Sequence, residues 1–198
     1  MRHHSPRIDR RRPMLRRLVF VLCLIATGTS ETNAGSPKLP AAPTGFQWIW
    51  SPEMGGGFLC PDGWHAKKEK KADTEALFIT KENIDTEGKF TTGLTVNVIS
   101  RIRRKTGLPP SRYMPRLLAE NAQGKKVLLE LPPKKSGRIT GHVLRLQDDV
   151  LVVHHSLLAD DQTDKLYVVS FESPVGEWES NKKYWEPMLG KMAWEFPK

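Results

Sequence analysis

Cysteine is nearly missing from this sequence, which contains two cysteines among 198 residues. Cys23 lies in an apolar segment near the amino terminus, so Cys60 is the single cysteine of the remaining chain. One cysteine forms no internal disulfide, and the fold therefore has to be held by its hydrophobic core. Hydrophobic residues make up 38% and charged residues 27% of the chain, which is a globular composition and not a disordered one.

Long hydrophobic runs are also missing. The apolar run Leu18–Ala26 is about half of the roughly 20 residues that a membrane-spanning helix needs, so we expect no transmembrane anchor. It follows the strongly basic segment Met1–Arg17 and precedes small and polar residues up to Ala34. This order is typical of a secretory signal. We therefore predict an export signal over residues 1–34, cleaved after Ala34 or a few residues earlier, and a mature protein that is periplasmic or extracellular.

A strong charge of one sign is absent from the predicted mature chain. The formal net charge is +9, but seven arginines against Asp9 and Glu31 place +5 of it within residues 1–34. The remaining +4 is too small an excess to indicate a nucleic-acid partner. Residues 35–45 are rich in proline, glycine, serine and alanine and predict a flexible lead-in. Residues 46–198 contain no internal repeat and predict a single globular domain.

Apolar residues alternate along several short segments, which is typical of strands. The predicted strands are 46–50, 76–80, 93–99, 126–131, 137–146, 150–153 and 166–171. Helical spacing predicts two helices, over 109–123 with Ser111 as the N-cap, and over 177–193 with Pro187 as a kink. Strands that follow one another across short polar turns indicate an antiparallel sheet, and so an α+β fold.

Three segments together resemble a known pattern. Phe58–Trp64, with Pro61-Asp62-Gly63-Trp64, resembles the strand and Pro-x-Gly-Trp opening of PsbP-like domains. Leu94–Val98 is similar to the alternating strand before their first long helix. Leu166–Phe171, Ser173-Pro174 and the segment through Trp185 to Phe196 resemble their closing strand, polar link and terminal helix. The glycines at 55–57 depart from the usual opening.

This resemblance implies an α/β/α sandwich with a central antiparallel sheet over nearly all of residues 46–197. The superfamily includes extrinsic subunits of photosystem II, a Ran-binding import factor and many small exported bacterial proteins. Its characterised members act mainly as accessory or binding subunits. The three matching segments are those expected to build the fold, so the resemblance assigns no functional residue.

Motifs of nucleophilic and metal-dependent catalysis are not found in the sequence: it has no glycine elbow and no metal-ligand spacing. His154 and His155 are neighbours on a predicted strand and point to opposite faces, so we expect one to be exposed and the other half-buried. His142 could join one of them from an adjacent strand. A hydrolase that uses His142 with His154 or His155 and an acidic residue is the main alternative function. Cys60, beside a turn, is predicted to be a buried packing residue.

Three further clusters have simple structural interpretations. Asp160–Asp164 lies between two predicted strands and predicts a turn. The basic runs Lys67–Lys71 and Arg101–Lys105 are predicted to be solvated loops. Arg101, Arg103 and Arg104 could also contact an anionic surface. Trp48 and Trp50 share one face of a short strand and are the aromatic pair predicted to form a binding surface.

The sequence therefore favours an exported, non-catalytic accessory or binding domain without a cofactor. Its partner is expected to be a protein of the cell envelope, bound through Trp48, Trp50, Arg101, Arg103 and Arg104. A protein that binds a small ligand or an anionic surface is a second alternative.

Overall fold

A computed structural model describes residues 39–195 of the chain. The predicted export signal and its cleavage site lie outside these residues. Within the described range, every helix is too short or too polar to cross a bilayer.

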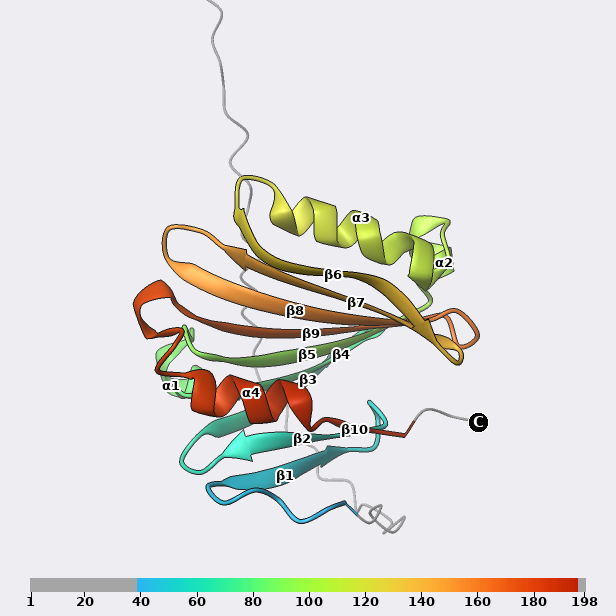
Figure 1. The fold of residues 1–198 in the computed structure, drawn as a ribbon. Coiled ribbons are helices and arrows are strands. Elements are labelled where there is room, and N and C mark those ends of the chain that lie inside the picture. Colours follow the sequence, from blue (N-terminus) through green and yellow to red (C-terminus); the bar gives the residue numbers. More distant parts are fainter. Residues whose placement is uncertain (1–38, 196–198) are drawn as a thin grey trace, which may run out of the picture. The chain divides into compact units, whose positions relative to one another are not determined.

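Ten strands and five short helices make up the described chain (Figure 1). The strands are β1 Phe46–Ser51, β2 Gly56–Pro61, β3 His65–Lys71, β4 Thr74–Thr80, β5 Gly93–Ser100, β6 Lys126–Ser136, β7 Ile139–Gln147, β8 Leu151–Asp160, β9 Lys165–Pro174 and β10 Ala193–Trp194. The helices are α1 Ile84–Glu87, α2 Ile102–Thr106, α3 Pro110–Ala122, the 3-10 helix η1 Val175–Glu177 and α4 Lys182–Gly190.

The strands form two sheets, both antiparallel. The larger sheet has seven strands in the order β3-β4-β5-β9-β8-β7-β6, and the smaller has three in the order β1-β2-β10. Consecutive strands β6 to β9 pair as a meander, as the sequence predicted, and β9 then pairs with β5 on its other side. The predicted α+β class with a central antiparallel sheet is confirmed.

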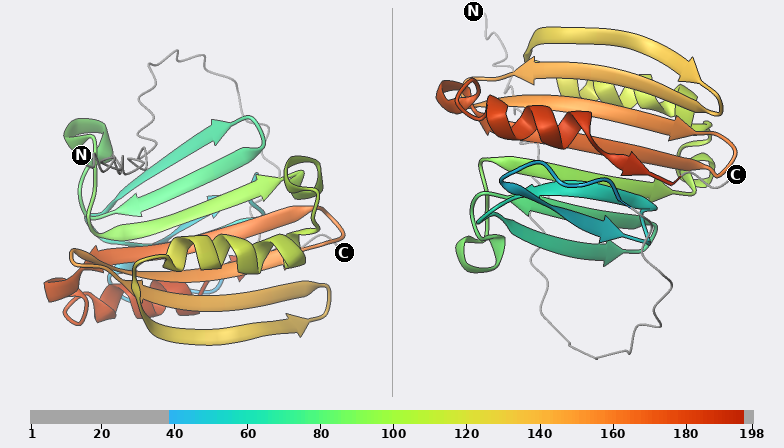
Figure 2. Two further views of the ribbon diagram at one scale, coloured as in Figure 1. Left: turned by 90° about the horizontal axis from the view of Figure 1, so that it is seen from above. Right: turned by 60° about the horizontal axis from the view of Figure 1, so that its bottom comes forward.

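The two faces of the seven-stranded sheet are covered differently (Figures 1 and 2). One face, here the α3 face, packs Leu144, Leu146 and Leu157 against Met114 and Leu118 of α3. The opposite face, here the α4 face, packs against α4 and the three-stranded sheet. Its core contains apolar side chains of β4, β5, β8 and β9 together with β2 and α4 residues such as Phe58 and Met188. One outer layer of the sandwich is thus part helix and part sheet.

Aromatic side chains join the layers on the α4 face. The Trp194 ring lies edge-on to both Phe58 and Tyr167, with ring centroids 5.1 Å apart in each pair. Phe171 contacts Trp178, which stacks on Trp185 at 5.2 Å. Trp178 thus belongs to the α4-side core, and Trp185 and Trp194 pack against it, Trp194 from the short strand β10.

Three sequence predictions of local structure were wrong. The basic run at 67–71 is part of β3 and not a loop, because an edge strand exposed on both faces needs no apolar alternation. The second basic run includes α2 and not only loop. The predicted helix over 177–193 is divided into η1, α4 and β10, so its ordered helical part begins only at Lys182.

The N-cap of α3 was also predicted wrongly. Pro109 occupies the N-cap position and forms no side-chain cap. The backbone N–H of Ser111 instead donates to the Asp161 carboxylate at 2.9 Å, and its hydroxyl donates to the other carboxylate oxygen at 2.6 Å. A residue 50 positions away in the sequence therefore caps this helix.

The lead-in predicted for residues 35–45 is described from Leu39 onward. The Trp48 indole N–H donates to the Pro40 carbonyl at 2.7 Å, and Ala42 packs against the core. The backbone N–H of Asp62 donates to the Gly45 carbonyl at 2.9 Å. These contacts attach the described part of the lead-in to the domain.

Candidate functional site

The three histidines do not converge on one site. His142 and His155 lie on the α3 face, because each is two residues from a side chain of the α3-side core, Leu144 and Leu157 respectively. His154 lies on the α4 face. His142 Nε2 is 3.2 Å from the Glu130 carboxylate. Within the described residues, no three histidine, cysteine or carboxylate side chains are placed to hold a metal ion.

Both histidines of the pair are buried, so the prediction of one exposed ring was wrong: His154 is 8% and His155 9% exposed. The reason is that the meander places β8 between β7 and β9, with packing on both faces. Burial lowers the pKa of His154 to about 4, with a smaller contribution from the Arg145 charge. Burial also lowers the pKa of His155 to about 4, with a smaller contribution from the charge of Lys125. Both rings are neutral at pH 7 and are poorly matched to acid–base work near that pH.

One contact on the α3 face resembles a nucleophile and its base. His155 Nδ1 is 2.8 Å from the Ser170 hydroxyl oxygen on β9. Catalysis at a serine also needs donors for the developing oxyanion. β9 pairs with β5 on one side and β8 on the other, which engages its backbone N–H groups in the sheet. We therefore interpret the His155–Ser170 contact as a buried hydrogen bond that joins β8 and β9.

The acidic run at 160–164 forms the β8–β9 turn, as predicted. Asp160 accepts hydrogen bonds from the backbone of Gln162 and Thr163 and pairs with Arg138 at 2.6 Å. Asp161 caps α3, and Asp164 accepts from the backbone N–H of Arg103 at 3.0 Å. Each carboxylate thus has a structural partner.

The predicted basic patch surrounds a buried aspartate. The Asp73 side chain is 7% exposed and pairs with Arg101, Arg104 and Lys105, the last two at 3.1 and 3.5 Å. Arg103 points instead to the Asp161 carbonyl, to which it donates at 2.7 Å. All the predicted patch arginines are therefore bound within the domain, and contact with an anionic surface stays a prediction.

The predicted tryptophan pair is half-buried. Trp48 packs against the α4-side core and donates its indole N–H to Pro40. The Trp50 carbonyl accepts from Lys68 Nζ at 3.1 Å. Cys60 is buried in β2, where burial raises the pKa of its thiol. Its predicted packing role agrees with this position, and binding through the tryptophans stays a prediction.

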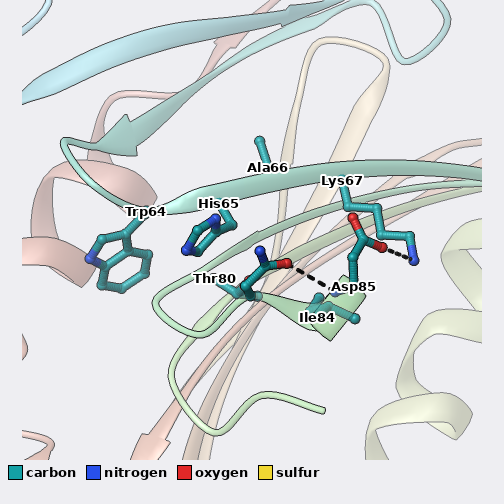
Figure 3. Close-up of a pocket in the computed structure, with 8 residues that line it drawn as sticks. Trp64, His65, Ala66, Lys67, Thr80, Ile84 and Asp85 are labelled. Atoms are coloured by element: carbon teal, nitrogen blue, oxygen red, sulfur yellow. Dashed lines mark hydrogen bonds and ion pairs between the residues drawn. The ribbon is translucent and has the colours of Figure 1, made fainter. Parts of the chain in front are cut away.

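A pocket of about 280 Å³ lies between the start of β3, the end of β4 and α1 (Figure 3). Figure 3 shows Trp64 and His65 at one end and the Lys67–Asp85 ion pair, 2.7 Å long, at the other. The Asn83 side chain accepts from the Asp85 backbone at 3.0 Å. Ligand pockets are usually larger and mostly apolar. This pocket is small and its polar groups are largely bonded to one another, so it offers little binding energy.

The α4 face offers a broader candidate. Register places Leu129 opposite Arg145 and Leu131 opposite Val143, with Ser156 opposite Val143 on its other side. Paired residues share a face, so these five side chains form one surface, here the β6–β8 surface. Figure 2 (right) shows α4 crossing this face beside the yellow and orange strands. The α4-side core of the described residues includes no side chain of β6 or β7.

Arg145 anchors one end of the β6–β8 surface beside α4. Its guanidinium carbon lies 5.0 Å from the Trp178 ring centroid and 4.9 Å from that of Trp185. Burial lowers the pKa of Arg145, and the Glu179 charge acts in the opposite direction. The sequence did not predict that Arg145 contacts these two tryptophans. β7 and α4 are about forty residues apart, and sequence spacing shows only contacts between near neighbours.

No protein-family model and no curated protein sequence matches the chain. The solution structure of cyanobacterial PsbP from Synechocystis sp. PCC 6803 is similar at a TM-score of 0.51 and 12% identity, covering 83% of this chain and 100% of that chain. The Saccharomyces cerevisiae Ran-binding protein Mog1p gives a TM-score of 0.44 at 13% identity, covering 74% of this chain and 94% of that chain. At 12% identity, the similarity to cyanobacterial PsbP establishes the fold alone. The predicted PsbP-like fold is confirmed.

Proposed function

We propose that this domain, which has the fold of cyanobacterial PsbP, is an exported, non-catalytic binding domain that holds a protein partner of the cell envelope on its β6–β8 surface. The export part of the proposal rests on the order of basic, apolar and small residues within residues 1–34, which is typical of a secretory signal. The binding role rests on the exposed Leu131 and the half-buried Leu129 and Val143 beside it, which is the observation that carries the proposal.

Exposed apolar side chains are concentrated on β6. Among the described residues, Val127, Leu128 and Leu131 are three of the five large hydrophobic side chains that are exposed. Leu131, 51% exposed, lies on the β6–β8 surface, whereas Val127 pairs with Leu146 and so lies on the α3 face. Clustered exposed apolar side chains mark interaction sites more often than scattered ones do. Leu129 and Val143, which are half-buried, extend the apolar area from Leu131 toward Arg145.

Charge and backbone define the kind of partner. β6 also carries the exposed cations Lys126, Lys134 and Lys135, so an apolar surface bordered by carboxylates complements it. Pro132 and Pro133 have no backbone N–H, and β6 contains two irregularities in register. Prolines, lysines and bulges on an edge strand hinder the addition of another strand. The partner therefore docks on the face of β6–β8 and does not extend the sheet.

The test is co-purification from the envelope of the native host, comparing Leu131→Glu with Val175→Glu. Both side chains are exposed hydrophobics, but Val175 lies in η1 and outside the β6–β8 surface. We expect a partner that copurifies with the wild type and with Val175→Glu, and loses at least about tenfold in recovery with Leu131→Glu, because a buried unpaired carboxylate is costly.

A photo-crosslinking side chain at Leu131 identifies the same contact directly, with Arg116 on the exposed side of α3 as the control position. The proposal requires that the crosslinked partner at Leu131 is the one lost in Leu131→Glu. Equal recovery by both glutamate variants, or equal crosslinking from Arg116, contradicts it.

A further inference from the structure

Arg145 is held in a fixed orientation by three aromatic neighbours. Its guanidinium packs against Trp178 and Trp185, whose rings stack at an angle of 21°. Its Nε donates to His154 Nδ1 at 3.3 Å. The Trp185 indole N–H is itself held by the Trp178 carbonyl at 3.2 Å. An arginine held in this way loses little side-chain entropy when it binds a further group.

The contacts of His154 determine how its protons are placed. Its Nδ1 accepts from Arg145, so in the neutral ring the proton must be on Nε2. That nitrogen lies 3.2 Å from the Ser156 hydroxyl oxygen, to which it donates. Ser156 Oγ thereby has an acceptor site filled, and its own hydrogen is left to donate elsewhere. Arg145 and Ser156 are both on the β6–β8 surface.

The two terminal nitrogens of Arg145 have no acceptor among the described residues, and no carboxylate there lies within ion-pair distance of them. Buried or half-buried guanidinium groups usually have such partners. We propose that Arg145, with the hydroxyl of Ser156, is a preformed binding site for a carboxylate group.

The rings that contact Arg145 are neutral, and the Glu179 carboxylate, whose charge acts on Arg145, lies beyond ion-pair distance. The cation is therefore left for one further negative charge. His154 contributes no second positive charge at neutral pH, and the planar fork of a guanidinium matches a carboxylate through two parallel hydrogen bonds. The apolar side chains Leu129 and Val143 beside it exclude water and strengthen such a contact. The site deepens the proposed function by naming the group that a partner presents there, but free carboxylates test it without any partner.

The experiment is an NMR titration of the mature domain, following the Arg145 Nε–H and Trp185 Nε1–H signals. Sodium acetate and inorganic phosphate are the probes, and sodium chloride at equal ionic strength is the control. We expect both signals to shift and saturate with acetate at millimolar concentrations, with little change in chloride.

Arg145→Lys keeps the charge but removes the planar fork, and we expect its acetate affinity, read from Trp185, to fall roughly tenfold. Ser156→Ala should weaken binding by about threefold to tenfold. Arg112→Lys, an exposed substitution on α3, should leave binding unchanged. Near-ultraviolet circular dichroism shows whether the tryptophan packing survives in each variant.

The inference is overturned by shifts that increase linearly without saturation, by equal shifts in acetate and chloride, or by saturation with phosphate alone. Unchanged acetate affinity in a folded Arg145→Lys variant also overturns it. Loss of acetate binding with unchanged partner recovery separates this site from the proposed docking surface. If Leu131→Glu leaves partner recovery intact while acetate still saturates Arg145, the docking proposal fails and the carboxylate site stands.

Discussion

Two buried histidines and a half-buried glutamate give the central strands opposing responses to pH. The pKa of Glu172 is raised to about 7, mainly by burial, with Glu82 and Asp148 acting in the same direction and Lys125 against them. The pKa values of His154 and His155 are lowered to about 4. Between pH 4 and 6.5 the folded histidines bind fewer protons than the unfolded ones, so their contribution to stability falls as pH falls through this window.

Glu172 has the opposite sign. Between its ordinary pKa of 4.5 and its folded value of about 7, the folded domain binds more protons than the unfolded chain, so stability falls as pH rises through this window. Glu172→Gln removes this loss. We expect the variant to gain about 1–2 kcal/mol relative to the wild type between about pH 5 and pH 8, measured by urea unfolding.

The matched control for Glu172 is Glu120→Gln, which removes the same charge from an exposed position on α3. Its difference from the wild type should stay nearly constant with pH. Parallel pH profiles of Glu172→Gln and the wild type contradict the assignment, because the histidines are common to both proteins and cancel in the comparison.

At the level of secondary structure, the ends of elements are stabilised by residues distant in sequence. α3 begins with Pro109 and Pro110, which supply no side-chain cap, and the β8–β9 turn provides the carboxylate instead. Asp73 in the β3–β4 turn similarly holds the cations around α2. These turns meet at one end of the sheet, where acidic and basic runs that look like separate surface clusters in the sequence are paired.

Asp161→Ala tests the cap of α3. The substitution removes both acceptors of Ser111, and we expect a loss of about 1–2 kcal/mol in the free energy of unfolding, as for other helix caps. Asp149→Ala, in the exposed β7–β8 turn, should change stability by less than about 0.5 kcal/mol. Equal losses in the two variants, measured by urea unfolding, are incompatible with the capping role.

At the scale of the whole molecule, one central sheet separates two unequal layers. α3 covers the strands from β7 to β9 on one face, whereas α4 and the three-stranded sheet leave the β6–β8 surface exposed on the other. A fold that covers its sheet incompletely retains apolar and charged groups for a partner, and this is the basis for both the docking surface and the carboxylate site.

Export gives a prediction for the whole chain. If residues 1–34 are a signal, the protein recovered from the envelope or the medium should begin at Gly35 or a few residues earlier, as measured by amino-terminal sequencing or intact mass. Replacing Leu22 and Leu24 by Arg should retain the uncleaved chain in the cytoplasm, because the apolar run is what the export machinery recognises. Recovery of the full-length chain outside the cytoplasm contradicts cleavage.

Much of the fold could be predicted because its signals are local. The alternation of Leu94, Val96 and Val98 predicted β5, and all three side chains are buried on one face. Gly63 adopts a φ of 78° in the predicted turn, where glycine is favoured. β3 was missed because an exposed edge strand has no apolar face, and its partner β4 decides its conformation.

The candidate site was determined only by tertiary structure. The sequence by itself determined most strands of the large sheet and the helix α3, because side-chain period and turn residues act over a few positions. It missed β3 and misplaced the bounds of the last helix. It did not determine that Trp48 faces the core, that Arg101 pairs with Asp73, or that Arg145 lies against Trp178 and Trp185. These contacts join residues far apart in the chain, and only the order and register of the packed strands bring them together.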